Sequence, residues 1–282
     1  MAQTALPRVT GTRVAPRPSF RRLWPGWALF VVSLPMLGFL VIPILALLLR
    51  VSPADLLSNL LTPEVSQALW LSILTAFVTT AVVLCAGTPL AYLLARYSFR
   101  GRTVIETLVD LPMVLPPAVA GIALLLTFGR RGLVGQPMSD FGIEVAFTPV
   151  AVVLAQIFVA APYYIKSAMA GFVDVDRDLE QAAATDGAAG RHVFRYVTLP
   201  LAGPALFGGA VMAWARALGE FGATIIFAGN LPGRTQTMPL AIYMGFEMHL
   251  NVALTLAAIL LALSFGVLFM VKRILKQRVG LL

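Results

Sequence analysis

Residues 173–200 read VDVDRDLEQAAATDGAAGRHVFRYVTLP and form a polar stretch between two long apolar runs. Three aspartates come first, an alanine run follows, and Gly187 comes shortly after it. Aspartate favours the N-terminal end of a helix, alanine is a strong helix former, and glycine suits the left-handed position after a helix. The pattern predicts a short helix that ends before Gly187, a second helical stretch over about 189–199, and Pro200 at the opening of the next membrane helix. From the residues alone, the segment is either a compact knob for a partner or a plain interfacial helix pair.

The chain on both sides of this stretch is strongly apolar. Of its 282 residues, 59% are hydrophobic and 12% are charged, and the mean hydropathy is +0.87. A soluble fold needs more charge to cover its surface, and a membrane β-barrel would show short alternating segments instead of long runs. The composition therefore excludes an ordinary soluble enzyme, a disordered chain and a disulfide scaffold. It predicts an all-α polytopic membrane protein, in which the single cysteine, Cys85, is a small buried hydrophobic residue.

Six apolar runs reach the roughly 20 residues that cross ~30 Å of hydrocarbon. They lie at about 25–49, 67–95, 108–128, 147–168, 203–226 and 250–271. Most of the 21 basic residues fall on one side when these runs are threaded through a bilayer, so the positive-inside rule predicts that both termini are cytoplasmic. The net charge of +8 is then a topology signal, and no nucleic-acid partner is needed to explain it. We expect a basic cytoplasmic tail over 1–23 and one membrane domain over 24–282.

The sequence offers little support for catalysis by this chain. It contains no Gly-Lys dipeptide, no HExxH and no GxSxG, and its two histidines, His192 and His249, lie far apart. A phosphate-binding P-loop, a zinc site and a nucleophile elbow are therefore not predicted. We expect no catalytic residue and no metal ligand, and we interpret both histidines as solvated or partner-facing side chains.

The spacing within 173–200 resembles the EAA loop of ABC-type importer permeases. Gln181-Ala182-Ala183 occupies the place of the Glu-Ala-Ala triplet, and Gly187, Val197 and Leu199-Pro200 follow at the family's spacing. The departure is Gln181, where the family often has Glu, although Glu180 lies one residue earlier. The resemblance implies that this coupling loop, about 173–200, inserts a helix into a separate ATPase. The residues that it marks are Glu180, Gln181, Ala182, Ala183, Asp186, Gly187, Ala188, Leu199 and Pro200.

A second stretch narrows the resemblance to one branch of these permeases. Residues 215–224 read ARALGEFGAT, which is similar to both the molybdate/tungstate and the sulfate permeases. The continuation through Asn230-Leu231-Pro232-Gly233 to Pro239 is more like the molybdate branch, as is Gly129–Leu133. The resemblance covers nearly the whole chain after about residue 60.

Two predicted spans carry unusual residues in their apolar runs. Arg216 and Glu220 lie four residues apart on one helical face, where they either form an ion pair, line a pathway, or do both. Gly219 and Gly222 flank Glu220 and can break the fifth span, while Pro112, Pro116 and Pro117 must kink or delay the third. The resemblance implies that these two spans border the translocation path, with Arg216, Glu220, Phe221, Gly222, Pro116 and Pro117 as path or gate candidates.

The polar residues just before those prolines recur every four positions. Arg102, Glu106 and Asp110 are expected on one face at the inner membrane surface, either solvated or as part of a gate. Arg102 and Glu106 have the spacing of a modest helix ion pair.

The resemblance also implies the other subunits of the transporter. We expect the type I ABC importer permease fold in a bacterial inner membrane, with two permease subunits as a homodimer, two cytoplasmic ATPase subunits and an extracytoplasmic oxyanion-binding protein. This chain would hold no cofactor, because ATP and Mg would bind the partner ATPase. The expected cargo is molybdate, or tungstate, moved by alternating access. The alternatives are a sulfate/thiosulfate permease and an ion-coupled secondary carrier that uses Arg216 and Glu220 as a charge relay.

Overall fold

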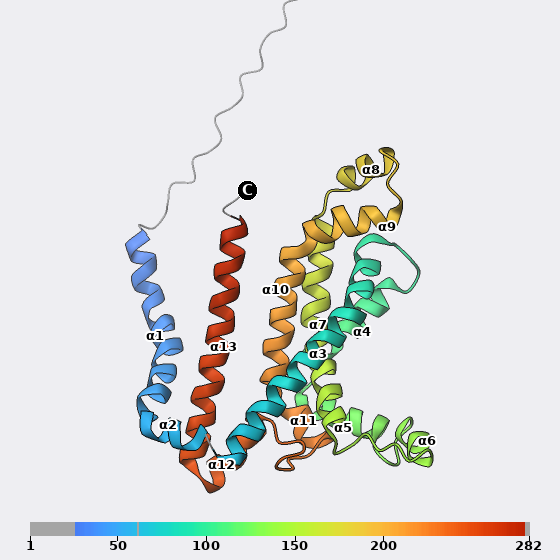
Figure 1. Cartoon of the computed structure of the whole chain (residues 1–282). Coiled ribbons are helices and arrows are strands. Elements are labelled where there is room, and N and C mark those ends of the chain that lie inside the picture. The colour runs from blue at the N-terminus through green and yellow to red at the C-terminus, as the bar shows by residue number, and fades with distance from the viewer. Residues whose placement is uncertain (1–25, 61, 280–282) are drawn as a thin grey trace, which may run out of the picture. The chain divides into compact units, whose positions relative to one another are not determined.

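The computed structural model describes residues 26–60 and 62–279, and within these ranges the regular structure is helical (Figure 1). The chain divides into two compact units at Ala46–Leu47, so α1 is described by itself. The helices are α1 (Gly26–Arg50), α2 (Pro53–Leu60), α3 (Pro63–Arg96), α4 (Arg102–Val114), α5 (Pro117–Phe128), α6 (Gly135–Asp140), α7 (Pro149–Asp174), α8 (Arg177–Thr185), α9 (Gly190–Val193), a π-helix (Phe194–Thr198), α10 (Leu199–Leu218), α11 (Gly222–Phe227), α12 (Met238–Met248) and α13 (Leu250–Val279).

Five helical segments in the described residues are long and apolar enough to cross a membrane. They are α1, α3, α7, the run Gly190–Leu218 and α13. The third predicted span corresponds to the pair α4 and α5, which is bent by 117° at its break and is either one broken span or a re-entrant loop. The described residues thus hold five candidate spans, or six if the bent pair is one span, which agrees with the prediction of about six. The basic tail at 1–23 lies outside the described residues.

Two predicted spans differ in detail from continuous helices. The third is broken at Leu115–Pro116, because Pro116 and Pro117 cannot continue a helix that starts before them. The fifth was predicted over 203–226, but its helix runs from Gly190 to Leu218 and stops there. A separate short helix, α11, begins at Gly222, so the break predicted at the two glycines is present.

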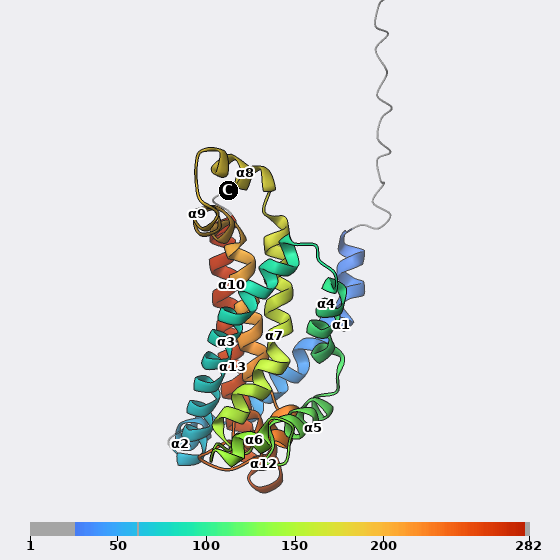
Figure 2. The same cartoon turned by 90° about the vertical axis from the view of Figure 1, so that its right-hand side faces the viewer.

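The core of the second unit is a tight bundle of α3, α7 and α10, which lie side by side in Figures 1 and 2. Small residues let their backbones approach closely: a Cβ on Gly87 would lie 2.9 Å from the Tyr164 ring, and one on Gly209 would lie 2.8 Å from the Cβ of Ser167. Such contacts are the usual means of helix association in lipid, where burial of apolar surface contributes little. Cys85 is exposed on α3, so the expectation of a buried cysteine is wrong.

A buried polar cluster adds a second link between α3 and α7. Gln156 is fully enclosed, and its Nε2 donates to Thr75 Oγ1 at 3.1 Å while Thr79 Oγ1 donates to its Oε1 at 3.0 Å. Each polar group of this side chain therefore has a partner where water is absent. The bundle carries α8 and α9 at one end and α6 and α12 at the other (Figure 1).

Candidate functional site

The segment predicted to be a helical knob forms α8, whose two ends are capped. Asp176 precedes the helix, and its Oδ1 accepts a hydrogen bond from the backbone N–H of Asp178 at 2.9 Å. At the other end, Gly187 has a φ of +89°, its N–H donates to the carbonyl of Ala184, and the N–H of Ala188 donates to the carbonyl of Ala183. These bonds form a Schellman motif, which satisfies the last carbonyls of the helix and turns the chain sharply. The predicted helix and its stop at Gly187 are confirmed.

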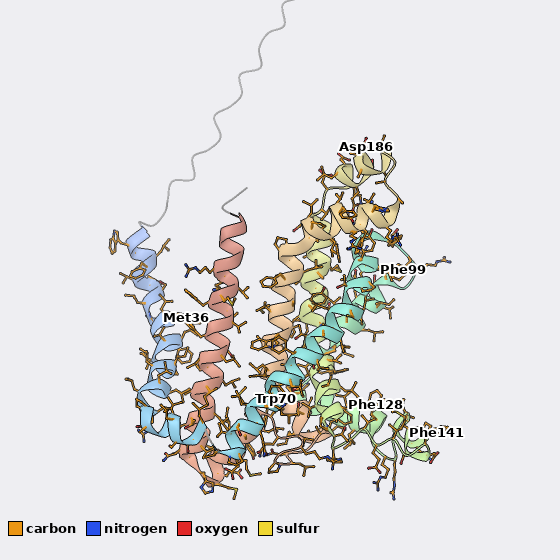
Figure 3. All side chains as sticks on the ribbon, in the orientation of Figure 1. Met36, Trp70, Phe99, Phe128, Phe141 and Asp186 are labelled. Carbon is orange, nitrogen blue, oxygen red and sulfur yellow. The ribbon has the colours of Figure 1, made fainter. Side chains whose placement is uncertain are left out.

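The marked residues of the coupling loop divide between two places. Gln181, Ala182, Asp186 and Gly187 are exposed on α8 and its C-terminal turn, and Figure 3 shows Asp186 at the extreme end of the molecule's second unit. Ala183 and Ala188 are half-buried beneath them. Leu199 and Pro200 instead start α10, and the chain reaches them through α9 and the π-helix without a break.

Glu180 points away from that exposed surface and contacts two spans. Its Oε1 lies 3.1 Å from Nη2 of Arg96, in the last turn of α3, and accepts a hydrogen bond from Oγ1 of Thr198 at 2.5 Å. The same Nη2 of Arg96 donates to the carbonyl of Val175 at 2.9 Å. Sequence reasoning counted Arg96 only as a topology charge and missed Thr198, because neither is near Glu180 in the chain.

An aromatic cluster lies next to this junction. Tyr92 of α3 meets Phe172 of α7 edge-on, with ring centroids 5.3 Å apart, and meets Phe194 of the π-helix at 5.0 Å. Edge-to-face contacts at these distances are favourable beyond the area that they bury. The ends of α3, α7 and the run leading into α10 are therefore packed together beneath α8.

The intramembrane pair lies at the break between α10 and α11. Nη1 of Arg216 lies 3.4 Å from Oε2 of Glu220, and the Glu220 side chain is 1% exposed. The other carboxylate oxygen, Oε1, accepts a hydrogen bond from the N–H of Ala223 at 2.8 Å, so Glu220 also caps α11. The predicted mutual ion pair is present, and the carboxylate has a second role that spacing did not predict.

The two broken spans meet at their breaks. A Cβ on Gly222 would lie 2.5 Å from the Cβ of Pro117, and one on Gly121 would lie 2.9 Å from the carbonyl oxygen of Ala223. Glycine at these positions thus allows α5 and α11 to touch along their backbones. Pro116 occupies the turn before α5, and the ring of Phe221 contacts Tyr243 with centroids 5.4 Å apart. The structure therefore brings Pro117 and Gly222 together beside the ion pair.

The polar face ahead of the prolines makes two ion pairs. Arg102 Nε lies 2.8 Å from Glu106 Oε1, as the spacing predicted. Asp110 Oδ2 lies 2.7 Å from Nζ of Lys166 on α7, a partner that sequence spacing did not identify. The second pair joins α4 to the central bundle.

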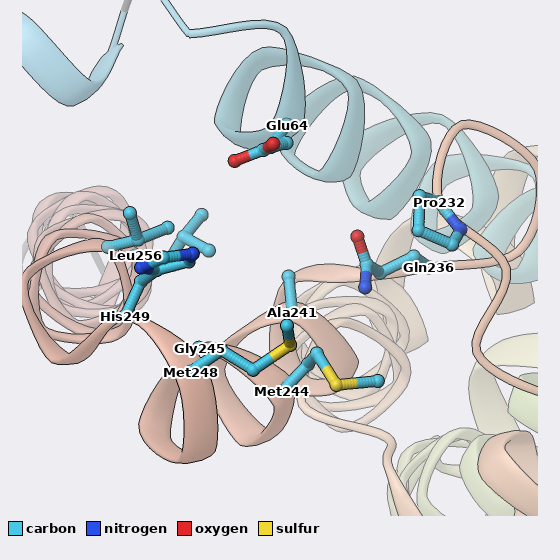
Figure 4. A pocket seen from close by; sticks show the side chains of 10 residues that line it. Glu64, Pro232, Gln236, Ala241, Met244, Gly245, Met248, His249 and Leu256 are labelled. Carbon is cyan, nitrogen blue, oxygen red and sulfur yellow. The ribbon is translucent and has the colours of Figure 1, made fainter.

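A cavity of about 210 Å³ lies at the α12 end of the bundle (Figure 4). Its lining includes the carboxylate of Glu64, the amide of Gln236 and the imidazole of His249, with Met244 and Met248 beside them. Within residues 26–60 and 62–279, no group of three or more His, Cys, Asp or Glu is arranged to hold a metal ion. His249 is exposed at the edge of α12, as expected for an interfacial histidine.

Bent and broken spans around an ion pair, with a capped helix projecting from one end, form a multi-span helical membrane fold. The family model for the "Binding-protein-dependent transport system inner membrane component" matches residues 87–280, and the chain belongs to this family. It is thus a multi-pass inner-membrane protein and a permease component of a transport system, not an enzyme.

Named relatives and a solved structure agree with this assignment. The chain is 41% identical over 242 residues to the molybdenum transport system permease protein ModB of Mycobacterium bovis, covering 85% of this chain and 90% of that protein. It is 34% identical over 271 residues to the sulfate transport system permease protein CysT of Salmonella typhimurium, covering 93% and 96%. A bacterial ABC transporter involved in alginate import has the same fold, with a TM-score of 0.70 at 14% identity over 89% of this chain and 96% of that one.

Proposed function

We propose that the chain is the membrane permease of an ATP-driven importer that moves molybdate, or the similar oxyanion tungstate, into the cytoplasm. The observation that carries the proposal is α8, a doubly capped helix that presents Gln181 and Ala182 at the end of the bundle with the register of an EAA loop. The greater identity to a molybdenum permease than to a sulfate permease supports the choice of cargo.

The coupling loop is the proposed contact with the energy source. Its exposed residues form a compact surface that can enter a groove on a separate cytoplasmic ATPase, which would bind ATP and Mg. Two copies of this permease, as a homodimer, and two ATPases would complete the transporter. The loop end of the bundle, with α8 and α9, is therefore the cytoplasmic end, and the excess of basic residues on one side of the predicted spans predicts that both termini are cytoplasmic too.

The meeting of α5 and α11 is the proposed wall of the translocation path. Broken helices at membrane depth are tolerated where they line a cavity or are buried in protein. Arg216 is one-third exposed beside the buried Glu220, so its guanidinium can face a passing dianion while the carboxylate keeps it in place. A weak contact of this kind suits a path, since tight binding would hinder release. Selectivity would then come from an extracytoplasmic oxyanion-binding protein.

Two alternative functions would use the same residues differently. A sulfate permease would share the fold and the coupling loop, and would differ in cargo. An ion-coupled secondary carrier would use Arg216 and Glu220 as a charge relay and would need no ATPase. The exposed, capped α8 favours the importer, because it offers a surface to a separate partner and a self-contained carrier requires no such partner.

Uptake of labelled molybdate by cells that lack only this chain tests the proposal. We expect uptake to fall in those cells, to return with the wild-type gene, and to resist a large excess of sulfate in the parent strain. Competition by sulfate would instead support the sulfate permease. Uptake that persists without the chain, in cells with no second molybdate route, would contradict the proposal.

A further inference from the structure

A single carboxylate oxygen joins the cytoplasmic helix α8 to two membrane spans. Oε1 of Glu180 contacts Arg96 Nη2 at 3.1 Å and Thr198 Oγ1 at 2.5 Å. Arg96 ends α3, and Thr198 immediately precedes α10. The two contacts span 84 and 18 residues of sequence, so they join elements that the chain itself does not hold in register.

The junction is shielded from water. The side chains of Arg96 and Glu180 are 8% and 19% exposed, and the same guanidinium nitrogen also bonds the carbonyl of Val175 at the start of the loop. Charge-assisted hydrogen bonds in such surroundings are short and directional. The Arg96–Glu180–Thr198 contacts therefore fix α8 relative to both spans more firmly than an exposed ion pair would.

The link continues to the intramembrane pair through α10. This helix runs without a break from Leu199 to Leu218, a length of about 30 Å at 1.5 Å per residue. Thr198 lies just before one end, and Arg216 lies in the last turn at the other. A displacement of the Thr198 end therefore reaches the Arg216–Glu220 pair and the break before α11.

The α4–α5 pair is attached differently. Its charged contact with the bundle is the Asp110–Lys166 pair, whose side chains are both 40% exposed, and Ile105 and Val109 pack against the apolar core beside it. A partly exposed ion pair holds two helices together less rigidly than an enclosed one. The polar contacts of Glu180 reach α3 and the residue before α10, so movement of α8 is transmitted to these two spans first.

We propose that the Arg96–Glu180–Thr198 junction transmits movement of α8 jointly to α3 and α10, so that Arg96 and Thr198 are positioning residues for transport. The proposal rests on the proposed function, in which α8 docks on the ATPase. Without the junction, a bound ATPase would move α8 without moving α3 and α10.

The test uses the whole transporter, this chain with its ATPase and the oxyanion-binding protein, reconstituted in proteoliposomes. The variants are Arg96→Met, Glu180→Gln and Thr198→Val, and the control is Arg102→Met, which removes a cation from the more exposed Arg102–Glu106 pair. The measurements are co-purification of the ATPase, ATP hydrolysis, and labelled molybdate taken up per ATP. We expect the ATPase to remain bound in all four, uptake per ATP to fall about tenfold in Arg96→Met, and the control to match wild type.

Rescue separates a positioning role from a packing role. The double variant Arg96→Glu with Glu180→Arg exchanges the two charges. It should recover part of the uptake per ATP that Arg96→Glu alone and Glu180→Arg alone each lose. Unchanged uptake per ATP in Arg96→Met and Glu180→Gln would overturn the proposal. If Arg96→Met fails to assemble, Thr198→Val removes one hydroxyl alone, and an unchanged ratio in that variant would overturn it equally.

A different variant tests docking of the ATPase on α8 separately from the junction. Ala182→Arg alters the exposed face of α8 without touching the junction, and we expect it to release the ATPase. If the ATPase stays bound and active in Ala182→Arg, docking through α8 fails. If Ala182→Arg releases the ATPase while the junction variants keep wild-type uptake per ATP, docking stands and the junction proposal fails.

Discussion

Replacement of Glu220 removes two interactions at once, and two variants separate them. Glu220→Ala removes both the hydrogen bond to the Ala223 N–H at 2.8 Å and the ion pair with Arg216 at 3.4 Å. Glu220→Gln keeps an oxygen that can cap α11 and removes only the charge. The difference between the two variants therefore contains the cap together with the packing of the buried side-chain atoms that only alanine lacks.

The magnitudes follow from these contacts. Loss of a helix-capping oxygen costs about 1 kcal/mol. Loss of one member of a fully buried ion pair costs about 3–5 kcal/mol, but Arg216 is one-third exposed, so this pair is only partly desolvated and its loss costs less. We expect about 1 kcal/mol of destabilisation for Glu220→Gln, about 2–3 kcal/mol for Glu220→Ala, and a coupling energy with Arg216→Ala of about 1 kcal/mol.

The assay is a double-mutant cycle on purified protein in detergent, read by thermal or denaturant unfolding, with labelled molybdate uptake in parallel. The Arg102/Glu106 cycle is the matched control, since that pair has the same four-residue spacing and lies at a more exposed site. A coupling energy below that of the control would refute a direct Arg216–Glu220 interaction. Equal destabilisation by Glu220→Gln and Glu220→Ala would refute the capping role.

Three other substitutions test separate parts of the account. Gly187→Val forces a branched side chain into a φ of +89°, which costs about 1–2 kcal/mol or more. We expect the amount of protein in the membrane to be unchanged, while ATPase binding or molybdate uptake is lost. Wild-type uptake would contradict this prediction. Gly222→Ala places a methyl group 2.5 Å from Pro117, and we expect uptake to fall with about 1–3 kcal/mol of destabilisation. The control Gly203→Ala meets nothing within 4 Å inside α10, so it should leave uptake unchanged and should not lower the unfolding free energy. Gln156→Leu removes two hydrogen bonds to α3 and should lower the unfolding free energy by about 1–2 kcal/mol; no change in unfolding would show that the buried cluster does not stabilise the bundle.

Local sequence patterns predicted the features that local chemistry controls. The aspartates, alanines and Gly187 predicted α8 and its end, because capping and left-handed turns depend on neighbouring residues. The spacing of Arg216 and Glu220 predicted their contact for the same reason. The breaks at the prolines and glycines also follow from backbone constraints that act within one turn.

Contacts between distant residues could not be predicted in this way. Arg96 and Glu180 are 84 residues apart, and nothing in either neighbourhood selects the other. Asp110 was grouped with its own helix face, yet its partner is Lys166 on α7. The exposure of Cys85 was missed because α3 is apolar on every side, so periodicity does not say which face is buried.

The central claim is that this chain imports molybdate with energy taken from ATP through α8. The most direct measurement is accumulation of labelled molybdate in proteoliposomes that contain the permease, its ATPase and the oxyanion-binding protein, with ATP supplied on the ATPase side. We predict accumulation that requires ATP hydrolysis, is indifferent to an imposed ion gradient, and disappears with Ala182→Arg. Accumulation driven by an ion gradient without ATP, or by ATP with sulfate but not molybdate as cargo, would contradict the account.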